Sequence, residues 1–291
     1  MTKKKIKVKK LPLLIFTITI VLILVSIINT IKKPTSNKKT TKTKTNIKLE
    51  QLNNIDKKLS YFNYDNIDRY IDYKNKNKDL DIKQIIMDVN IGLDYEYYTN
   101  TKPSINLNTP KILVNKYNYV SEDYIPENLE NIDLKYARSG MKLVNYAKDA
   151  FEEMAKAAEK DGYRIIAMSS YRSYNYQVNL YNRYKIADGQ EAADTYSARA
   201  GFSEHQTGLA IDIYNGIEDY TNFEKTKEFT WMQDNAYKYG FILRFPKDKV
   251  KQTGYQYESW HYRYVGKDIA KYTKENNICF EEYYVQKIEN N

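Results

Sequence analysis

Histidine occurs only twice in the 291 residues, as His205 and His261. Two imidazoles and one carboxylate are a sufficient ligand set for a catalytic zinc ion whose fourth position stays open. Asp212 is the natural carboxylate, because it lies in the apolar run 209–213, where an acid must be paired or bound to a metal. Glu258, three residues before His261, is then placed to take a proton from an attacking water.

Each of these residues also has a structural interpretation. A single histidine is more often a hydrogen-bonded structural residue than a ligand, and a lone aspartate in a strand can simply cap a turn. Judged by spacing alone, the metal-binding and structural interpretations are about equally supported.

Three separated motifs add a resemblance to a known family. Residues 169–173 read SSYRS and are followed by Gln177, residues 203–212 read SEHQTGLAID, and residues 258–261 read ESWH. Together and in this order they resemble the VanY-type D-alanyl-D-alanine carboxypeptidases, zinc peptidases that trim the stem peptide of bacterial peptidoglycan. The resemblance extends over residues 85–285. The HExxH sequence of the larger zincin class does not occur in the chain.

The resemblance implies a role for each matched residue. His205, Asp212 and His261 resemble the zinc ligands of the family, and Glu258 resembles its general base. Arg172 resembles the arginine that polarises the scissile carbonyl or stabilises the oxyanion. This role suits a fixed guanidinium, since its charge offsets the negative charge that develops in the transition state.

Two further residues resemble the substrate-binding positions of the family. Ser203 and Gln177 are similar to residues that bind the terminal D-residue of the substrate or its carboxylate. Hydrogen bonding within a loop and a helix is the structural alternative for both side chains.

The implied activity is removal of the terminal D-alanine from peptidoglycan stem peptides by a zinc-activated water, without an acyl-enzyme. Two alternatives stay open. An L,D-carboxypeptidase or an endopeptidase acting on the same stem would have the same catalytic centre. A non-catalytic cell-wall-binding module is also conceivable, although it would not need the general base Glu258.

Helices and strands must bring these residues together. An apolar stripe of Val144, Ala147, Phe151, Met154, Ala155 and Ala158 predicts a helix over residues 139–162. Further helices are expected over 174–187, with Ser173 as the cap, and over 225–239. Strands are expected over 163–168, 209–213 and 241–245, with a last strand or turn over 255–264.

This order of elements predicts an α+β fold with a small, mainly antiparallel sheet flanked by helices. The resemblance implies the arrangement of DD-peptidases and of hedgehog-type signalling domains. Residues 50–75 are expected to form short helices, and residues 100–131, rich in proline and asparagine, an extended segment with many loops. We assign residues 50–291 to the zinc peptidase domain, with its core over 85–285.

The net charge of +9 belongs to the N-terminal part of the chain. Residues 1–49 contain thirteen lysines and no acidic residue, so residues 50–291 carry 33 basic and 37 acidic side chains, a net charge of −4. A basic nucleic-acid-binding domain is therefore not expected. The single cysteine, Cys279, excludes an internal disulfide and any zinc site made of several cysteines.

The N-terminal segment has the pattern of a membrane anchor. Residues 11–31 contain no charged side chain and would form a helix about 31 Å long, close to the roughly 30 Å core of a bilayer. Six lysines lie within residues 1–10, which predicts a cytoplasmic basic tail. Residues 32–49 predict a disordered stalk, so we expect a single-pass membrane protein with its peptidase domain outside the cytoplasm. A cleaved signal peptide is the alternative, with a shorter apolar region and a small-residue cleavage site.

Overall fold

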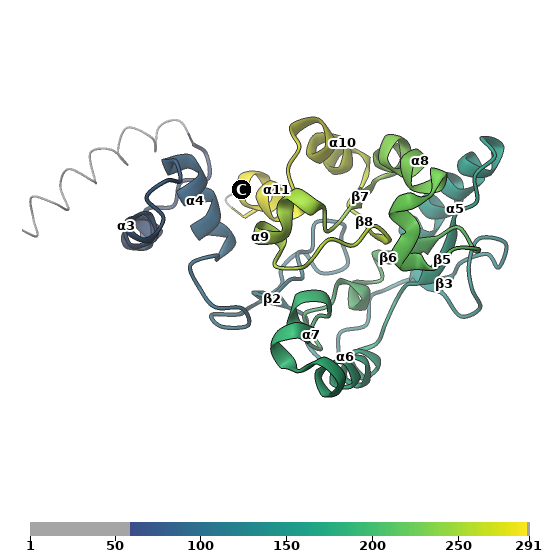
Figure 1. Cartoon of the computed structure of the whole chain (residues 1–291), viewed down its shortest axis with the longest axis horizontal. Coiled ribbons are helices and arrows are strands. Elements are labelled where there is room, and N and C mark those ends of the chain that lie inside the picture. The colour runs from purple at the N-terminus through teal and green to yellow at the C-terminus, as the bar shows by residue number, and fades with distance from the viewer. Residues whose placement is uncertain (1–58, 290–291) are drawn as a thin grey trace, which may run out of the picture. The chain divides into compact units, whose positions relative to one another are not determined.

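A four-stranded antiparallel sheet lies at the centre of the structure, with strand order β5-β6-β8-β7 (Figure 1). The computed structural model describes residues 59–289, so the predicted tail, anchor and stalk lie outside the described residues. Within residues 59–289 no helix has both the length and the apolar character needed to cross a membrane. The strands of the sheet are β5 (Ile166–Ser169), β6 (Ala210–Tyr214), β7 (Phe241–Leu243) and β8 (His261–Tyr264).

Strand β6 alternates as its sequence predicts. Ile211 and Ile213 point into the core, and Asp212 lies on the opposite face of the strand. The register of β6 against β8 places Asp212 directly opposite His261. On the other side of β6, a bulge between Ala167 and Ser169 brings Ser169 opposite Asp212. The sheet therefore collects three polar residues from three strands at one place.

Helix α5 (Asn145–Lys160) covers the apolar side of this sheet. Its buried stripe joins Ile211, Ile213 and Tyr262 in the main hydrophobic core, and the rings of Phe151 and Phe241 lie 6.4 Å apart. The predicted start at residue 139 is wrong. Val144 belongs to strand β4 (Lys142–Val144), which pairs with β3 (Leu129–Asn131), and its burial makes it fit the helical stripe although its backbone is extended.

The other predicted elements are found with shifted ends. Helix α6 (Tyr174–Asp188) begins at its predicted position, and the hydroxyl of Ser173 accepts a hydrogen bond from the backbone N–H of Tyr176 at 3.2 Å. The helix expected over 225–239 divides into α8 (Lys227–Asn235) and a 3-10 turn, Ala236–Tyr239, which ends at Gly240. Strands β5, β7 and β8 are each shorter than the ranges expected for them.

The remaining elements complete an α+β fold, as predicted. The short strands β1 (Lys102–Pro103) and β2 (Asn118–Tyr119) form a parallel pair within the loop-rich segment. Met87 and Ile91 of α4 (Ile82–Ile91) pack against Val285 of α11 (Phe280–Lys287), so the two helices lie side by side in Figure 1. The other α-helices of the described residues are α3 (Ile67–Lys76), α7 (Gln190–Tyr196), α9 (Val250–Thr253) and α10 (Lys267–Asn276).

Candidate metal centre and active site

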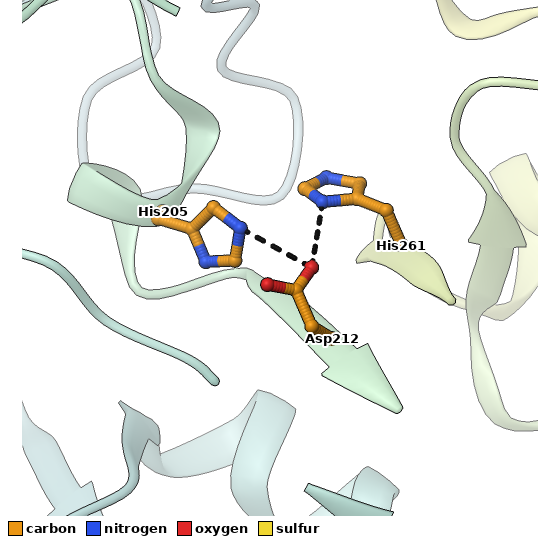
Figure 2. Close-up of side chains that lie close together, drawn as sticks. All are labelled: His205, Asp212 and His261. Atoms are coloured by element: carbon orange, nitrogen blue, oxygen red, sulfur yellow. Dashed lines mark hydrogen bonds and ion pairs between the residues drawn. The ribbon is translucent and has the colours of Figure 1, made fainter. Parts of the chain in front are cut away.

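The three predicted ligands converge on one point between β6 and β8 (Figure 2). His205 lies in a 3-10 turn, Glu204–Thr207, that precedes β6, and His261 is the first residue of β8. Oδ1 of Asp212 lies 3.4 Å from Nε2 of His205 and 3.0 Å from Nδ1 of His261. One ligand atom from each residue lies within 4.8 Å of the other two, and all three residues are buried.

The donor set and its spacing fit a zinc ion. Tetrahedral zinc with bonds of about 2.1 Å holds its ligand atoms about 3.4 Å apart. Nδ1 of His205 lies 2.7 Å from the carbonyl oxygen of Ser170, so its N–H donates there and leaves the lone pair of Nε2 facing Asp212. No second cluster of three such side chains occurs among residues 59–289.

Burial and charge prepare the ligands for a cation. Burial, with help from the positive charge of Arg172, lowers the pKa of His205 to about 4, so this imidazole is neutral at pH 7. Burial alone would raise the pKa of Asp212, but the positive charge of Arg172 and the hydrogen bond with His261 hold it well below its ordinary value. Burial would lower the pKa of His261, but the hydrogen bond with Asp212 and the nearby carboxylate of Glu204 outweigh it and raise the pKa to about 9. In the metal-free protein, the proton that Nδ1 of His261 shares with Asp212 therefore lies where the metal ion would bind.

Glu258 has the position and the proton affinity of a general base. Its Oε2 lies 3.9 Å from Nδ1 of His261, beside the ligand cluster. The turn that carries it is fixed by a hydrogen bond from the backbone N–H of Glu258 to the carbonyl oxygen of Phe245 at 3.1 Å. Burial, aided by the negative charge of Asp212, raises the pKa of Glu258 to about 7. A carboxylate of this kind exchanges protons near neutral pH.

Arg172 contacts the site from the other side of Asp212. Its Nη2 donates to Oδ2 of Asp212 at 2.6 Å, and Nε and Nη2 both donate to Oγ of Ser169, at 3.1 and 2.8 Å. The bulge in β5 is what places Ser169 there. The guanidinium is therefore fixed beside the metal position, as the predicted role requires.

All seven residues predicted for the site border one cavity of about 510 Å³. Gln177 and Ser203 are both buried in its wall. Nε2 of Gln177 donates to the carbonyl oxygen of Ala198 at 2.8 Å, which is the structural alternative realised for that atom. Its Oε1 is buried with no hydrogen-bond partner among the described residues. Substrate binding by Gln177 and Ser203 stays a prediction.

Several residues that the structure places at the site were not predicted from the sequence. Tyr220 and Tyr255 border the cavity, and the ring of Tyr220 meets that of Trp260 edge to face at 5.0 Å in the cavity wall. Thirty tyrosines spread over the chain hide such positions. Glu204 lies next to a ligand within the SEHQTGLAID motif, but the motif alone does not show what its side chain contacts.

The fold and the site define a metal-dependent hydrolase, with a buried His-Asp-His cluster that could hold a metal ion, a buried glutamate and a fixed arginine around one cavity. A family model described as VanY, D-alanyl-D-alanine carboxypeptidase, matches residues 140–267. YodJ of Bacillus subtilis (strain 168), a carboxypeptidase by name, is 40% identical over 206 residues, which are 66% of this chain and 76% of that protein. The chain belongs to the VanY family of D-alanyl-D-alanine carboxypeptidases, and it is a metallopeptidase.

Two solved structures have the same fold. The LdcB LD-carboxypeptidase is 39% identical, with a TM-score of 0.59 over 65% of this chain and 91% of that one. A vancomycin-resistance D,D-pentapeptidase VanY, solved in complex with Zn(II), is 35% identical, with a TM-score of 0.52 over 60% of this chain and 98% of that one. Family membership argues against the non-catalytic alternative.

Proposed function

We propose that the protein is a zinc-dependent D-alanyl-D-alanine carboxypeptidase that removes the terminal D-alanine from peptidoglycan stem peptides. The observation that carries this proposal is the convergence of His205, Asp212 and His261 beside Glu258 in one cavity. Membership of the VanY family supports the substrate class, and the Zn(II) complex of the related D,D-pentapeptidase supports the metal.

The residues of the chain divide the chemistry between them. Zinc held by His205, Asp212 and His261 supplies a Lewis acid and an acidified water. Glu258 accepts the proton of the attacking water and returns it to the amine of the leaving D-alanine. Arg172 stays fixed, and its charge offsets the negative charge that develops on the carbonyl oxygen. Ser203 and Gln177 bind the terminal residue or its carboxylate.

The match to the LdcB LD-carboxypeptidase favours a second candidate, cleavage of the tetrapeptide stem by an L,D-carboxypeptidase. Mass spectrometry of muropeptides incubated with the purified protein separates the two activities. Loss of one D-alanine from pentapeptides supports the first proposal. Trimming of tetrapeptides alone, with pentapeptides intact, rejects it in favour of the second.

The metal-dependent mechanism has its own test. Chelation should abolish turnover and added zinc should restore it, because the mechanism needs the Lewis acid that the metal supplies. Penicillin should form no covalent adduct, since β-lactams acylate serine nucleophiles. Covalent inactivation by penicillin, together with full turnover after dialysis against a chelator, contradicts the mechanism.

We also propose that residues 11–31 anchor the protein in the cell membrane, with the peptidase domain outside the cytoplasm. The absence of charge over these residues and the six preceding lysines support this topology. The protein should fractionate with membranes. Protease added to intact protoplasts should digest the peptidase domain. Recovery of the whole chain in the cytosol, or protection of the domain in intact protoplasts, would refute the topology.

A further inference from the structure

Two buried polar atoms beside the metal centre face each other without a hydrogen bond. Nε2 of His261 lies 3.7 Å from Oε2 of Glu204. Neither atom has a hydrogen-bond partner among the described residues. Buried polar atoms are nearly always satisfied, and leaving one unpaired costs about 1–3 kcal/mol. A hydrogen bond between Nε2 of His261 and Oε2 of Glu204 would satisfy both atoms.

The orientation of His261 shows what a contact with Glu204 would do. Nδ1 faces Asp212 and the metal position, and Nε2 lies on the side of the ring away from Asp212 (Figure 2). A neutral imidazole has one N–H and one lone pair, and a metal ligand must present the lone pair. A carboxylate only accepts hydrogen bonds, so Glu204 selects the tautomer with its proton on Nε2 and its lone pair on Nδ1.

His205 provides an internal comparison. Its Nδ1 lies 2.7 Å from the carbonyl oxygen of Ser170, which leaves Nε2 for the metal. Each imidazole of the site thus has an acceptor behind it, but the nitrogens are exchanged between the two residues. Outer-shell acceptors of this kind fix the tautomer and the ring orientation of a ligating histidine.

The two oxygens of Glu204 have separate partners. Oε1 accepts from Nε of Arg244 at 2.8 Å and from Nη1 of Arg263 at 2.9 Å. Oε2 is left for His261. Both guanidinium groups are fully buried, and Arg244 also donates to Glu281 at 2.5 and 2.9 Å. Two arginines and two glutamates form a buried, charge-balanced cluster behind the metal centre.

From this geometry we infer that Glu204 is a positioning residue for the metal centre, which holds the tautomer and orientation of His261. The inference rests on the proposed function only for the presence of a metal ligand at His261. Glu204 then increases the affinity of the site for the metal. This effect does not depend on which stem-peptide bond the enzyme cleaves.

Replacement of Glu204 by glutamine tests this role with little change of shape. The two arginines are donors and claim the one carbonyl oxygen of the amide. The NH₂ group of the glutamine then faces Nε2 of His261 and favours the wrong tautomer. The matched control is Glu281→Gln, which removes a carboxylate from the same cluster without touching either histidine.

Zinc affinity of the full-length protein, measured by competition with a chelator, is the readout. We expect Glu204→Gln to weaken zinc binding by about 10- to 100-fold, the usual effect of losing an outer-shell partner. Glu281→Gln should leave zinc binding unchanged in the molecules that remain folded. Equal weakening in the two variants would show that Glu204 only balances the charge of the arginines.

The proton itself is observable in the wild-type protein, which keeps the test decisive if Glu204→Gln does not fold. With two histidines in the chain, the ¹⁵N imidazole spectrum contains two spin systems. In the zinc-loaded protein the Nε2 proton of His261 should exchange slowly with water and resonate downfield. Rapid exchange of this proton overturns the inference. Neither measurement involves substrate, so a failed carboxypeptidase assay would count only against the proposed function.

Discussion

The guanidinium of Arg172 lies 2.6 Å from Oδ2 of Asp212, while Oδ1 of the same carboxylate faces the two histidines. One aspartate thus joins the metal centre to the residue proposed to stabilise the transition state. The position of the carboxylate is fixed from both sides, by the register of β6 against β8 and by the hydrogen bonds of Arg172 to Ser169.

Arg172→Ala should lower kcat by about 10²–10³-fold, the cost of losing a group that stabilises an oxyanion. Arg172→Lys should recover only part of this loss, because an ammonium group cannot bond Ser169 and Asp212 in the fixed fork of a guanidinium. Turnover is measured at saturating zinc, so that any weaker metal binding does not enter. Arg183→Ala, which removes an exposed arginine of α6 outside the cavity, is the control. Unchanged kcat in Arg172→Ala would contradict the assignment.

Glu258→Gln should lower kcat by about 10²–10⁴-fold with zinc retained, since the amide cannot accept the proton of water. Turnover and bound zinc are measured on the same preparation. Glu224→Gln removes a surface carboxylate that pairs with Lys247, and it should leave both quantities unchanged. If Glu258→Gln turned over at the wild-type rate, another group would have to be the base.

Glu258→Gln should also change the free energy of unfolding, in a direction that follows from the raised pKa of Glu258. Burial raises the pKa of Glu258 from its ordinary value of 4.5 to about 7. Between these values the folded protein holds a proton that the unfolded chain has released, so the stability of the wild type falls as the pH rises through this range. In the metal-free protein, Glu258→Gln should be more stable than the wild type by about 1–3 kcal/mol at pH 8.

Urea unfolding of the two metal-free proteins at several pH values measures this difference. The advantage of the glutamine variant should shrink as the pH falls toward 4.5, because the wild-type carboxyl is then neutral in both the folded and the unfolded state. A difference that is constant with pH, or that grows at low pH, would show that Glu258 is not held at a raised pKa.

Local patterns in the sequence, together with the family resemblance, were sufficient to predict the candidate ligands that the structure brings together and the main core helix. The alternation of β6 placed Asp212 opposite the apolar face, and the stripe from Ala147 to Ala158 marked the buried side of α5. The start of α5 was misplaced because Val144 is buried in a strand at a position that also continues the helical period. Periodicity of burial does not distinguish a helix from a strand at an element boundary.

The contacts between segments far apart in the chain could not be predicted from the sequence. The partners of Glu204 are Arg244 and Arg263, which lie 40 and 59 positions further along the chain. Only the pairing of β7 with β8 and of β8 with β6 brings these arginines together behind His205 and His261. A motif names the residues near a metal, but the register of a sheet decides which side chains lie behind them.

Gly208 is required by both its backbone and its surroundings, and the two costs are separable. It joins the turn that carries His205 to β6 with φ of +67°, and a Cβ there would lie 2.8 Å from Leu129 and 3.0 Å from Val144. Gly208→Ala should destabilise the protein by about 2–4 kcal/mol, the sum of left-handed strain and overpacking. Gly140 has φ of +83° with nothing within 4 Å, so Gly140→Ala should cost only about 1–2 kcal/mol. Urea unfolding of both variants gives the packing cost as their difference, and equal destabilisation would show that the β3–β4 side chains move aside freely.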